Sequence, residues 1–162
     1  MKTILAVAAA LGLLSGAALA QGAPVAFGGL KQDSSLPVEI ESDQLQVDQT
    51  AGTAVFTGDV RVKQGDMRMT APRVDVTYGT EGGKIDHIHA SGGVTLSSPT
   101  EAAEGAEAVY TIDTGAVVMT GNVLVTQGQS TIAGQRLVMD LNTGTGRMEG
   151  RVQTVFQPGK KP

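Results

Sequence analysis

The side chains with the greatest capacity for chemistry in this 162-residue sequence are few and scattered. His87 and His89 lie two positions apart, so on a strand they project from the same face. A metal centre needs a third and a fourth ligand, and the only local candidate, Asp86, is expected on the opposite face. We therefore interpret the two histidines as part of an exposed polar surface rather than as metal ligands.

Signature motifs of enzymes are absent from the sequence. It has no Gly-x-Ser-x-Gly elbow, no His-Glu-x-x-His pair, no phosphate-cradling glycine loop and no cysteine. The acidic run Glu101, Glu104 and Glu107 is interpreted as a solvated surface, with weak cation binding as the alternative. A formal net charge of −4 and the lack of a basic stripe argue against a nucleic-acid partner. We expect no enzyme activity, no cofactor and no metal.

A glycine-centred segment that occurs four times organises the chain. The copies are Phe56–Val62, Ala90–Leu96, Met119–Val125 and a diverged Met148–Thr154. Apolar residues alternate with small or polar ones in each copy, which is typical of a strand with one buried face. Glycine at the same inward position predicts a bend or a close approach of two backbones. The marker glycines Gly58, Gly92, Gly121 and Gly150 are separated by 34, 29 and 29 residues.

Each repeat also contains a second alternating segment, and turn signals separate the two. The turn signals include Asp113-Thr114-Gly115 and Asn142-Thr143-Gly144, while Gly79–Gly83 carries a five-residue insertion in the second repeat. Tight turns between short alternating runs favour antiparallel hairpins over a parallel β-helix, which also has a fixed period. The sequence predicts an all-β stack of antiparallel strands, built from four repeats of about 29 residues.

The chain ends are expected to lie outside this stack. Residues 1–20 have a short basic start, an apolar run and a small-residue cleavage site at Ala18-Leu19-Ala20, which predicts a signal peptide. An uncleaved membrane anchor is the alternative. Residues 21–36 lack any period and are predicted to be a flexible leader. The β-domain is placed at 37–157 and a tail at 158–162.

The array resembles the OstA-like family, which includes periplasmic lipopolysaccharide transport proteins. The resemblance is carried by Ser42–Asp48, Thr70–Tyr78 and the four Gly-x-Val segments, and it covers Val38 to Phe156. It implies an open, twisted antiparallel β-jellyroll that stacks head to tail. It also implies a periplasmic bridge that carries lipopolysaccharide between the two membranes with acyl chains inside. The implied partners are lipopolysaccharide, other copies, and the inner-membrane-anchored and outer-membrane components of the same pathway.

Alternation assigns one set of apolar side chains to the inner face, and these are the candidate lipid-binding residues. They are Phe56, Val60, Val62, Met67, Met69, Val74, Val76, Tyr78, Ile88, Met119, Val123, Val125, Leu137 and Met139. An ordinary closed core would have the same pattern. Five methionines, the four already in this set from Met67 to Met139 together with Met148, favour a soft lining that adapts to flexible chains.

The ends of the stack are the second candidate surface. Val38 and Ile40 are expected at one edge, and Val152 and Phe156 at the other; each strand interior holds at most one charge, and prolines only bracket the strands. Complementary edges at opposite ends would give head-to-tail oligomers. The basic cluster of Arg61, Lys63 and Arg68 is the candidate contact for headgroup phosphates. The alternative function is a structural β-stack or assembly scaffold of the cell envelope without lipid cargo.

Overall fold

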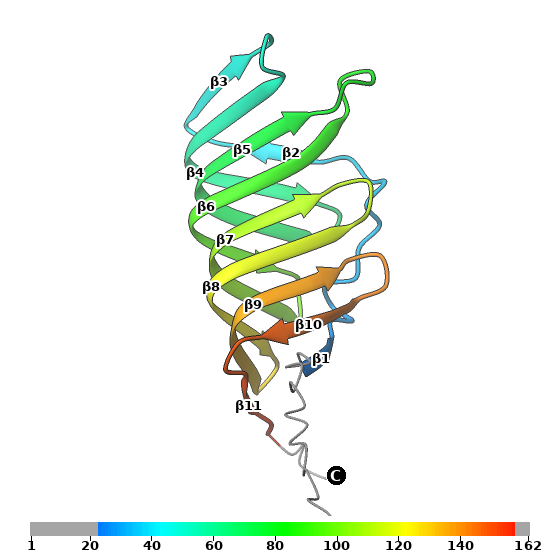
Figure 1. Ribbon diagram of the computed structural model, residues 1–162, viewed down its shortest axis with the longest axis vertical. Coiled ribbons are helices and arrows are strands. Elements are labelled where there is room, and N and C mark those ends of the chain that lie inside the picture. The colour runs from blue at the N-terminus through cyan, green and yellow to red at the C-terminus, as the bar shows by residue number, and fades with distance from the viewer. Residues whose placement is uncertain (1–22, 158–162) are drawn as a thin grey trace, which may run out of the picture.

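The computed structural model describes residues 23–157, which form one antiparallel β-sheet. Its 11 strands are β1 (Ala23–Ala26), β2 (Glu39–Glu41), β3 (Gln44–Asp48), β4 (Thr53–Gln64), β5 (Met67–Tyr78), β6 (Ile85–Ser97), β7 (Glu101–Thr111), β8 (Ala116–Gln127), β9 (Ser130–Asp140), β10 (Thr145–Glu149) and β11 (Gln153–Val155). From β3 to β10 each strand pairs with the next, while β2 also pairs with β4 and β11 with β9, and the sheet winds into an open, twisted jellyroll (Figure 1). The predicted all-β antiparallel fold is confirmed for this part of the chain.

Each long strand bends near its middle, and the bends divide the sheet into two arms. Pairing shifts by a bulge at each bend, for example between Thr57 and Val60 and between Thr120 and Val123. The first arm contains β2, residues 60–64, 67–71, 94–97, 101–105, 123–127 and 130–134, and β11. The second arm contains β3, residues 53–57, 73–78, 85–91, 107–111, 116–120 and 136–140, and β10. One sequence repeat therefore corresponds to two bent strands.

The repeated glycine produces the bend. Gly58, Gly92, Gly121 and Gly150 have φ angles of +82°, +91°, +84° and +81°, a left-handed conformation that side chains disfavour. Asn122, which follows Gly121, also has a positive φ of 49°, so the chain turns over two successive residues. A Cβ atom on Gly121 would lie 2.5 Å from the Cβ atom of Ala106 on β7. The predicted bend is confirmed, and at Gly121 the neighbouring strand also lies close.

The two arms face each other and bury their alternate side chains between them (Figure 1). Val60 and Met69 of the first arm and Val74 and Ile88 of the second are all 0% exposed. The core consists mostly of Val, Met, Leu, Ile and Ala. A single sheet thus supplies both walls of its own core, because the bend brings the inner face of each strand against itself.

The N-terminal segment differs from the prediction. The segment 21–36 is predicted to be a flexible leader, but in its described part, 23–36, β1 pairs with β10, and Phe27 and Leu30 are each 1% exposed, so the sheet extends beyond the predicted start at residue 37. Gly29 permits close packing, since a Cβ atom there would overlap the side chain of Thr100. The predicted signal peptide (1–20) and tail (158–162) lie outside the described residues. Within residues 23–157, no helix has the length and apolar character needed to span a membrane.

We expect Gly121→Ala to lower the free energy of unfolding by about 3 kcal/mol. Roughly 1 kcal/mol comes from the left-handed backbone and about 2 kcal/mol from overlap with Ala106. Gly128→Ala is the matched control, because Gly128 has a φ of +58° but open space around its Cβ position. Urea denaturation measures both. The second substitution Ala106→Gly should recover part of the loss, whereas equal losses for Gly121→Ala and Gly128→Ala would contradict a close approach.

Candidate functional site

The structure places every candidate lipid-binding residue on the inner face of the sheet. Phe56 and Tyr78 are half-buried near one end of the stack, and the other 12 are at most 2% exposed. The five methionines are likewise at most 2% exposed, and they lie in one apolar cluster with the valines and leucines. Their unbranched, polarizable side chains can repack at low cost. The interior is therefore closed but soft, and contact of these residues with lipid stays a prediction.

The inner face remains exposed at the β3 end of the stack. Leu45 lies opposite Phe56 and Val47 lies opposite the buried Ala54, so both side chains point to the inner face. Each is nonetheless 56% exposed, because no further strand covers them. The apolar interior therefore continues to a free edge at this end, where β2 and β3 pair only with β4 (Figure 1).

The opposite end of the stack has a more complex edge than the sequence predicted. β11 pairs with residues 131–133 of β9, and Phe156 just beyond it is 74% exposed. β11 forms the edge of the first arm only. In the second arm β10 occupies the corresponding position, and β1 pairs with its other side. Of the predicted edge residues, Val38, Ile40 and Val152 are half-buried against the core and Phe156 is free.

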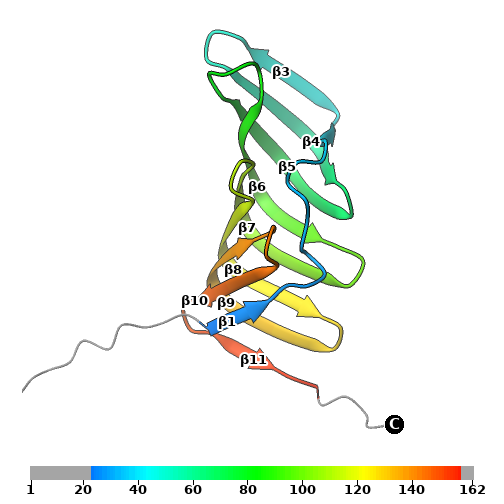
Figure 2. The ribbon, with the colours of Figure 1, turned by 90° about the vertical axis from the view of Figure 1, so that its right-hand side faces the viewer.

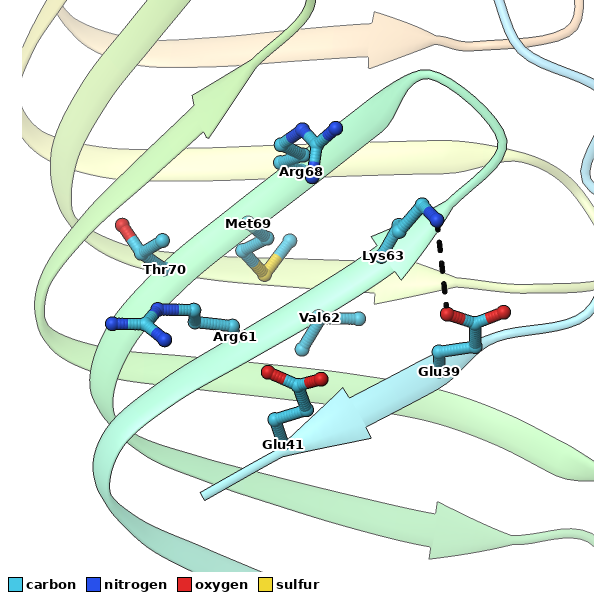
Figure 3. Close-up of a pocket in the computed structure, with 8 residues that line it drawn as sticks. All are labelled: Glu39, Glu41, Arg61, Val62, Lys63, Arg68, Met69 and Thr70. Carbon is cyan, nitrogen blue, oxygen red and sulfur yellow. Dashed lines mark ion pairs between the residues drawn. The ribbon is translucent and has the colours of Figure 1, made fainter. Parts of the chain in front are cut away.

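The predicted basic cluster lies beside a pocket on the outer side of β2, β4 and β5. Arg61, Lys63 and Arg68 line this pocket of about 260 Å³ together with Glu39, Glu41, Val62, Met69 and Thr70 (Figure 3). Lys63 Nζ lies 3.8 Å from Glu39 Oε2, and Arg61 Nη2 lies 2.8 Å from Asp59 Oδ2. The structure brings the three basic residues together as expected, but carboxylates neutralise part of their charge. Contact with a headgroup stays a prediction.

The two histidines share the outer face, as predicted. His89 Nε2 lies 3.1 Å from Glu107 Oε2. His87 Nδ1 lies 3.0 Å from Asp86 Oδ2, so the expectation that Asp86 points away from His87 is wrong. Asp86 lies next to the irregular end of the β5–β6 pairing, where strict alternation of side chains no longer holds. Among residues 23–157, no group of three or more His, Asp or Glu side chains is placed to hold a metal ion.

Sequence reasoning missed a polar clasp between the two arms. Gln64 at the end of the first arm is only 1% exposed, and its Oε1 accepts a 2.7 Å hydrogen bond from the hydroxyl of Tyr110 in the second arm. Its Nε2 donates to the backbone oxygens of Ser34 at 3.0 Å and Leu36 at 2.8 Å. The alternation along the strand could have revealed it, because Gln64 lies two positions after Val62 and therefore faces inward like Val60 and Val62. A polar residue at an inward position needs a buried partner.

Burial of Tyr110 has an electrostatic consequence. Removal of the phenol from water raises the pKa of Tyr110 to about 12, and the hydrogen bond with Gln64 acts in the opposite direction. The neutral phenol is therefore the form that the folded protein accommodates. Ionisation of Tyr110 would remove the hydrogen bond that it donates to Gln64, and Gln64 also holds the segment 34–36.

Comparisons with known proteins agree with this geometry. Residues 39–145 match the family described as "LptA/(LptD N-terminal domain) LPS transport protein". The chain is 32% identical to an uncharacterised protein of Rhizobium meliloti, over 90% of this chain and 84% of that one. It is 27% identical to the lipopolysaccharide export system protein LptH of Pseudomonas aeruginosa, over 93% and 95%.

Further similarities concern a third relative and a solved structure. The lipopolysaccharide export system protein LptA of Escherichia coli is 33% identical over 65% of this chain and 60% of its own length. The crystal structure of Pseudomonas aeruginosa LptH superposes with a TM-score of 0.70 at 22% identity, covering 78% of this chain and 99% of the other. This structural likeness supports the fold.

The pKa of Tyr110 predicts how stability depends on pH. Since the folded pKa is raised from about 10 in the unfolded chain, the contribution is present below pH 10 and is lost as the pH rises toward 12. The loss should be roughly 1.4 kcal/mol per pH unit in that window. Tyr110→Phe should lack this slope and be about 1 kcal/mol less stable at pH 7, because Gln64 loses a partner. Urea denaturation between pH 7 and 11.5 measures both effects. Equal slopes for the two proteins would contradict a buried phenol.

Proposed function

The chain belongs to the LptA/(LptD N-terminal domain) LPS transport protein family, and from this premise we propose that it is a periplasmic lipopolysaccharide-binding bridge protein. In this proposal it shields acyl chains in its apolar interior during transport from the inner to the outer membrane. It acts by binding and assembly and not as an enzyme. Its partners are lipopolysaccharide, further copies of itself, and the inner-membrane-anchored and outer-membrane components of the pathway.

One observation carries the proposal: the inner apolar face continues to an uncovered end of the stack. Leu45 and Val47 are inward-facing yet 56% exposed, whereas inward residues in the middle of the stack, such as Ile88 and Met119, are 0% exposed. Charged residues on terminal strands, here Glu39 and Glu41 of β2 and Asp48 of β3, discourage non-specific pairing, but they leave Leu45 and Val47 exposed. An exposed end of an apolar interior is suited to a chain-like apolar ligand that passes from one molecule to the next.

The energetics of acyl burial are sufficient for such a function. Each buried CH₂ group contributes about 0.8 kcal/mol, so eight of them would provide roughly 6 kcal/mol. Because the interior is already filled, an acyl chain must displace side chains. Methionines should move first, because their flexible side chains repack at the lowest free-energy cost. Met119 and Met139, on adjacent strands β8 and β9, are buried within this cluster. Part of the gain is thus spent on repacking, which favours reversible binding.

Head-to-tail assembly follows from the two edges. β2 and β3 present free backbone groups at one end, and β11 presents them at the other. Strand addition between β11 of one copy and β2 of the next would extend the first arm, with hydrogen bonds along the backbone and apolar contacts from alternate side chains. Two different surfaces in contact give an open-ended filament. Such a filament would join the inner faces of successive copies.

A structural β-stack without cargo is the second candidate function. It is favoured by the degree of burial, since other side chains of the protein cover the inward valines and methionines. Mass spectrometry of the protein purified from a lipopolysaccharide-producing cell distinguishes the two. Stoichiometric lipopolysaccharide supports the bridge, whereas an empty protein from such cells supports the scaffold.

We expect Val60→Thr to reduce lipopolysaccharide loading more than it reduces stability. Val60 is fully buried on the inner face, so the added hydroxyl makes the lining less favourable for acyl chains. Loading should fall about tenfold, while the melting temperature should fall by only a few degrees. Val118→Thr is the matched control on the outer face of β8. Normal loading combined with reduced stability would identify the interior as a core alone.

Deletion of residues 152–162 should abolish concentration-dependent oligomers and leave a folded monomer that binds lipopolysaccharide. The deletion removes β11, the free edge of the first arm at this end. Deletion of 158–162 alone is the control, because it retains β11. Sedimentation velocity over a range of concentrations is the measurement. Oligomers that persist unchanged without β11 would place the contact elsewhere.

A further inference from the structure

We propose that residues 23–36, here called the N-terminal strap, are an internal gate. The strap occupies the opening between the two arms and covers the edge of β10. It must leave before an acyl chain can enter from this side and before a second copy can pair with the full C-terminal end. The inference rests on the proposed lipopolysaccharide-binding function, and the experiment below separates the failure of one from the failure of the other.

The strap begins as a strand that covers the edge of β10. β1 is antiparallel to β10, with Val25 opposite Gly146 and Ala26 opposite Thr145. Without β1, the five residues of β10 would present a free edge, as β11 does in the other arm. β1 therefore takes the place that another strand would otherwise occupy.

The next residue of the strap fills a socket in the inner face. Position 146 is a glycine on β10, opposite the buried Met139. The ring of Phe27 packs into the space, since a Cβ atom on Gly146 would lie 2.6 Å from Phe27 Cε2. Phe27 is 1% exposed and Leu30 follows it into the core. A side chain from the strap thus completes an apolar layer that β10 leaves incomplete.

Beyond Phe27 the strap crosses the open side of the jellyroll and bonds to the ends of both arms. On the second arm, the amides of Phe27 and Gln32 donate to the backbone oxygens of Gly144 and Leu141, both at 2.7 Å. On the first arm, the amide of Leu30 donates to Glu101 Oε2 at 3.1 Å. Gln64 then holds Ser34 and Leu36 through the clasp described above. Figure 2 shows the segment running from β1 past the hairpin ends toward β2.

The attachment is of a kind that opens locally. After β1 the strap has no regular strand ladder, and it places two large side chains, Phe27 and Leu30, in the core. Lys31, Asp33 and Ser35 alternate outward or lie at the surface. Segments with few buried apolar contacts and surface backbone hydrogen bonds open at much lower free energy than the whole fold. An acyl chain would compete for the same apolar space as Phe27 and Leu30.

The strap determines which strand forms the edge of the second arm at the C-terminal end. At the N-terminal end both arms have free strands, β2 and β3. At the C-terminal end β11 is free, but β10 is covered by β1. β1 is now the terminal strand of this arm, but it has only four residues and its Pro24 lacks an N–H, so a second copy can pair with β10 itself only after β1 leaves. Entry of cargo and complete end-to-end pairing would then be coupled, since the same segment blocks both.

A reversible disulfide between β1 and β10 tests the gate. Ala26 and Thr145 are directly opposite and both exposed, and the sequence has no cysteine. We expect oxidised Ala26→Cys/Thr145→Cys to bind purified lipopolysaccharide at least tenfold more weakly than its reduced form, and to form smaller oligomers in sedimentation. The control Val109→Cys/Val118→Cys joins opposed residues on the outer faces of β7 and β8, which pair with neither β1 nor β10. It should bind equally well in both redox states.

Weakening the strap should have the opposite effect. Phe27→Ala/Leu30→Ala should bind at least fivefold more tightly than the native protein, whereas Leu36→Ala, at a 40% exposed position, should not. A 12-carbon fatty acid with a fluorescent terminal group is titrated in parallel as a probe of the interior. The fatty acid could bind the reduced Ala26→Cys/Thr145→Cys protein more tightly than the oxidised, locked form while neither form binds lipopolysaccharide. That result rejects the proposed function but supports the gate. Equal uptake by locked and reduced protein, or no uptake of either ligand even by Phe27→Ala/Leu30→Ala, overturns the gate.

Discussion

The bend in each strand is the constraint on which this structure depends. An antiparallel sheet of long alternating strands has only one apolar face, which must be covered by another layer. Here the left-handed glycines Gly58, Gly92 and Gly121 turn β4, β6 and β8, and the strands between them bend alongside, so that one half of each strand covers the other. The neighbouring strand supports the turn through close contact at Ala106. A core without helices or disulfides in residues 23–157 becomes possible because the bend recurs at the same level in every hairpin.

The same geometry sets a conflict between stability and transport. The inward valines and methionines stabilise the fold because they are buried, yet they can bind an acyl chain only if their packing yields. Aliphatic and methionine side chains with few aromatics suit this compromise, since they repack at lower cost than rings. The large aromatic side chains of the core belong to Tyr110, in the clasp, and Phe27, in the strap. The buried aromatic side chains thus gather at the opening, while the middle of the stack is lined by aliphatic and methionine side chains.

Closure of the opening depends on a small number of polar contacts. Gln64 joins Tyr110 of the second arm to the strap, and all its side-chain hydrogen-bonding groups have partners. Buried polar groups are costly when unpaired, so the clasp favours one arrangement of arms and strap over many partly open ones. Loss of the strap would leave Gln64 Nε2 to be satisfied by water or by a polar group of an incoming ligand. Displacement of the strap from the apolar interior would therefore also change the hydrogen bonds of Gln64.

The sequence by itself determined the strands, the bends and the inner face, because alternation and the spacing of Gly58, Gly92, Gly121 and Gly150 are local properties of the chain. It also separated the inward residues, such as Val60 and Met139, from the outward ones. It did not determine how the ends are covered. Three contacts cover the ends: β1 pairs with β10, Phe27 packs at Gly146, and Gln64 binds Tyr110. The first two join residues more than a hundred positions apart. Such contacts leave no periodic signal, since they depend on where the bent strands place their ends in space.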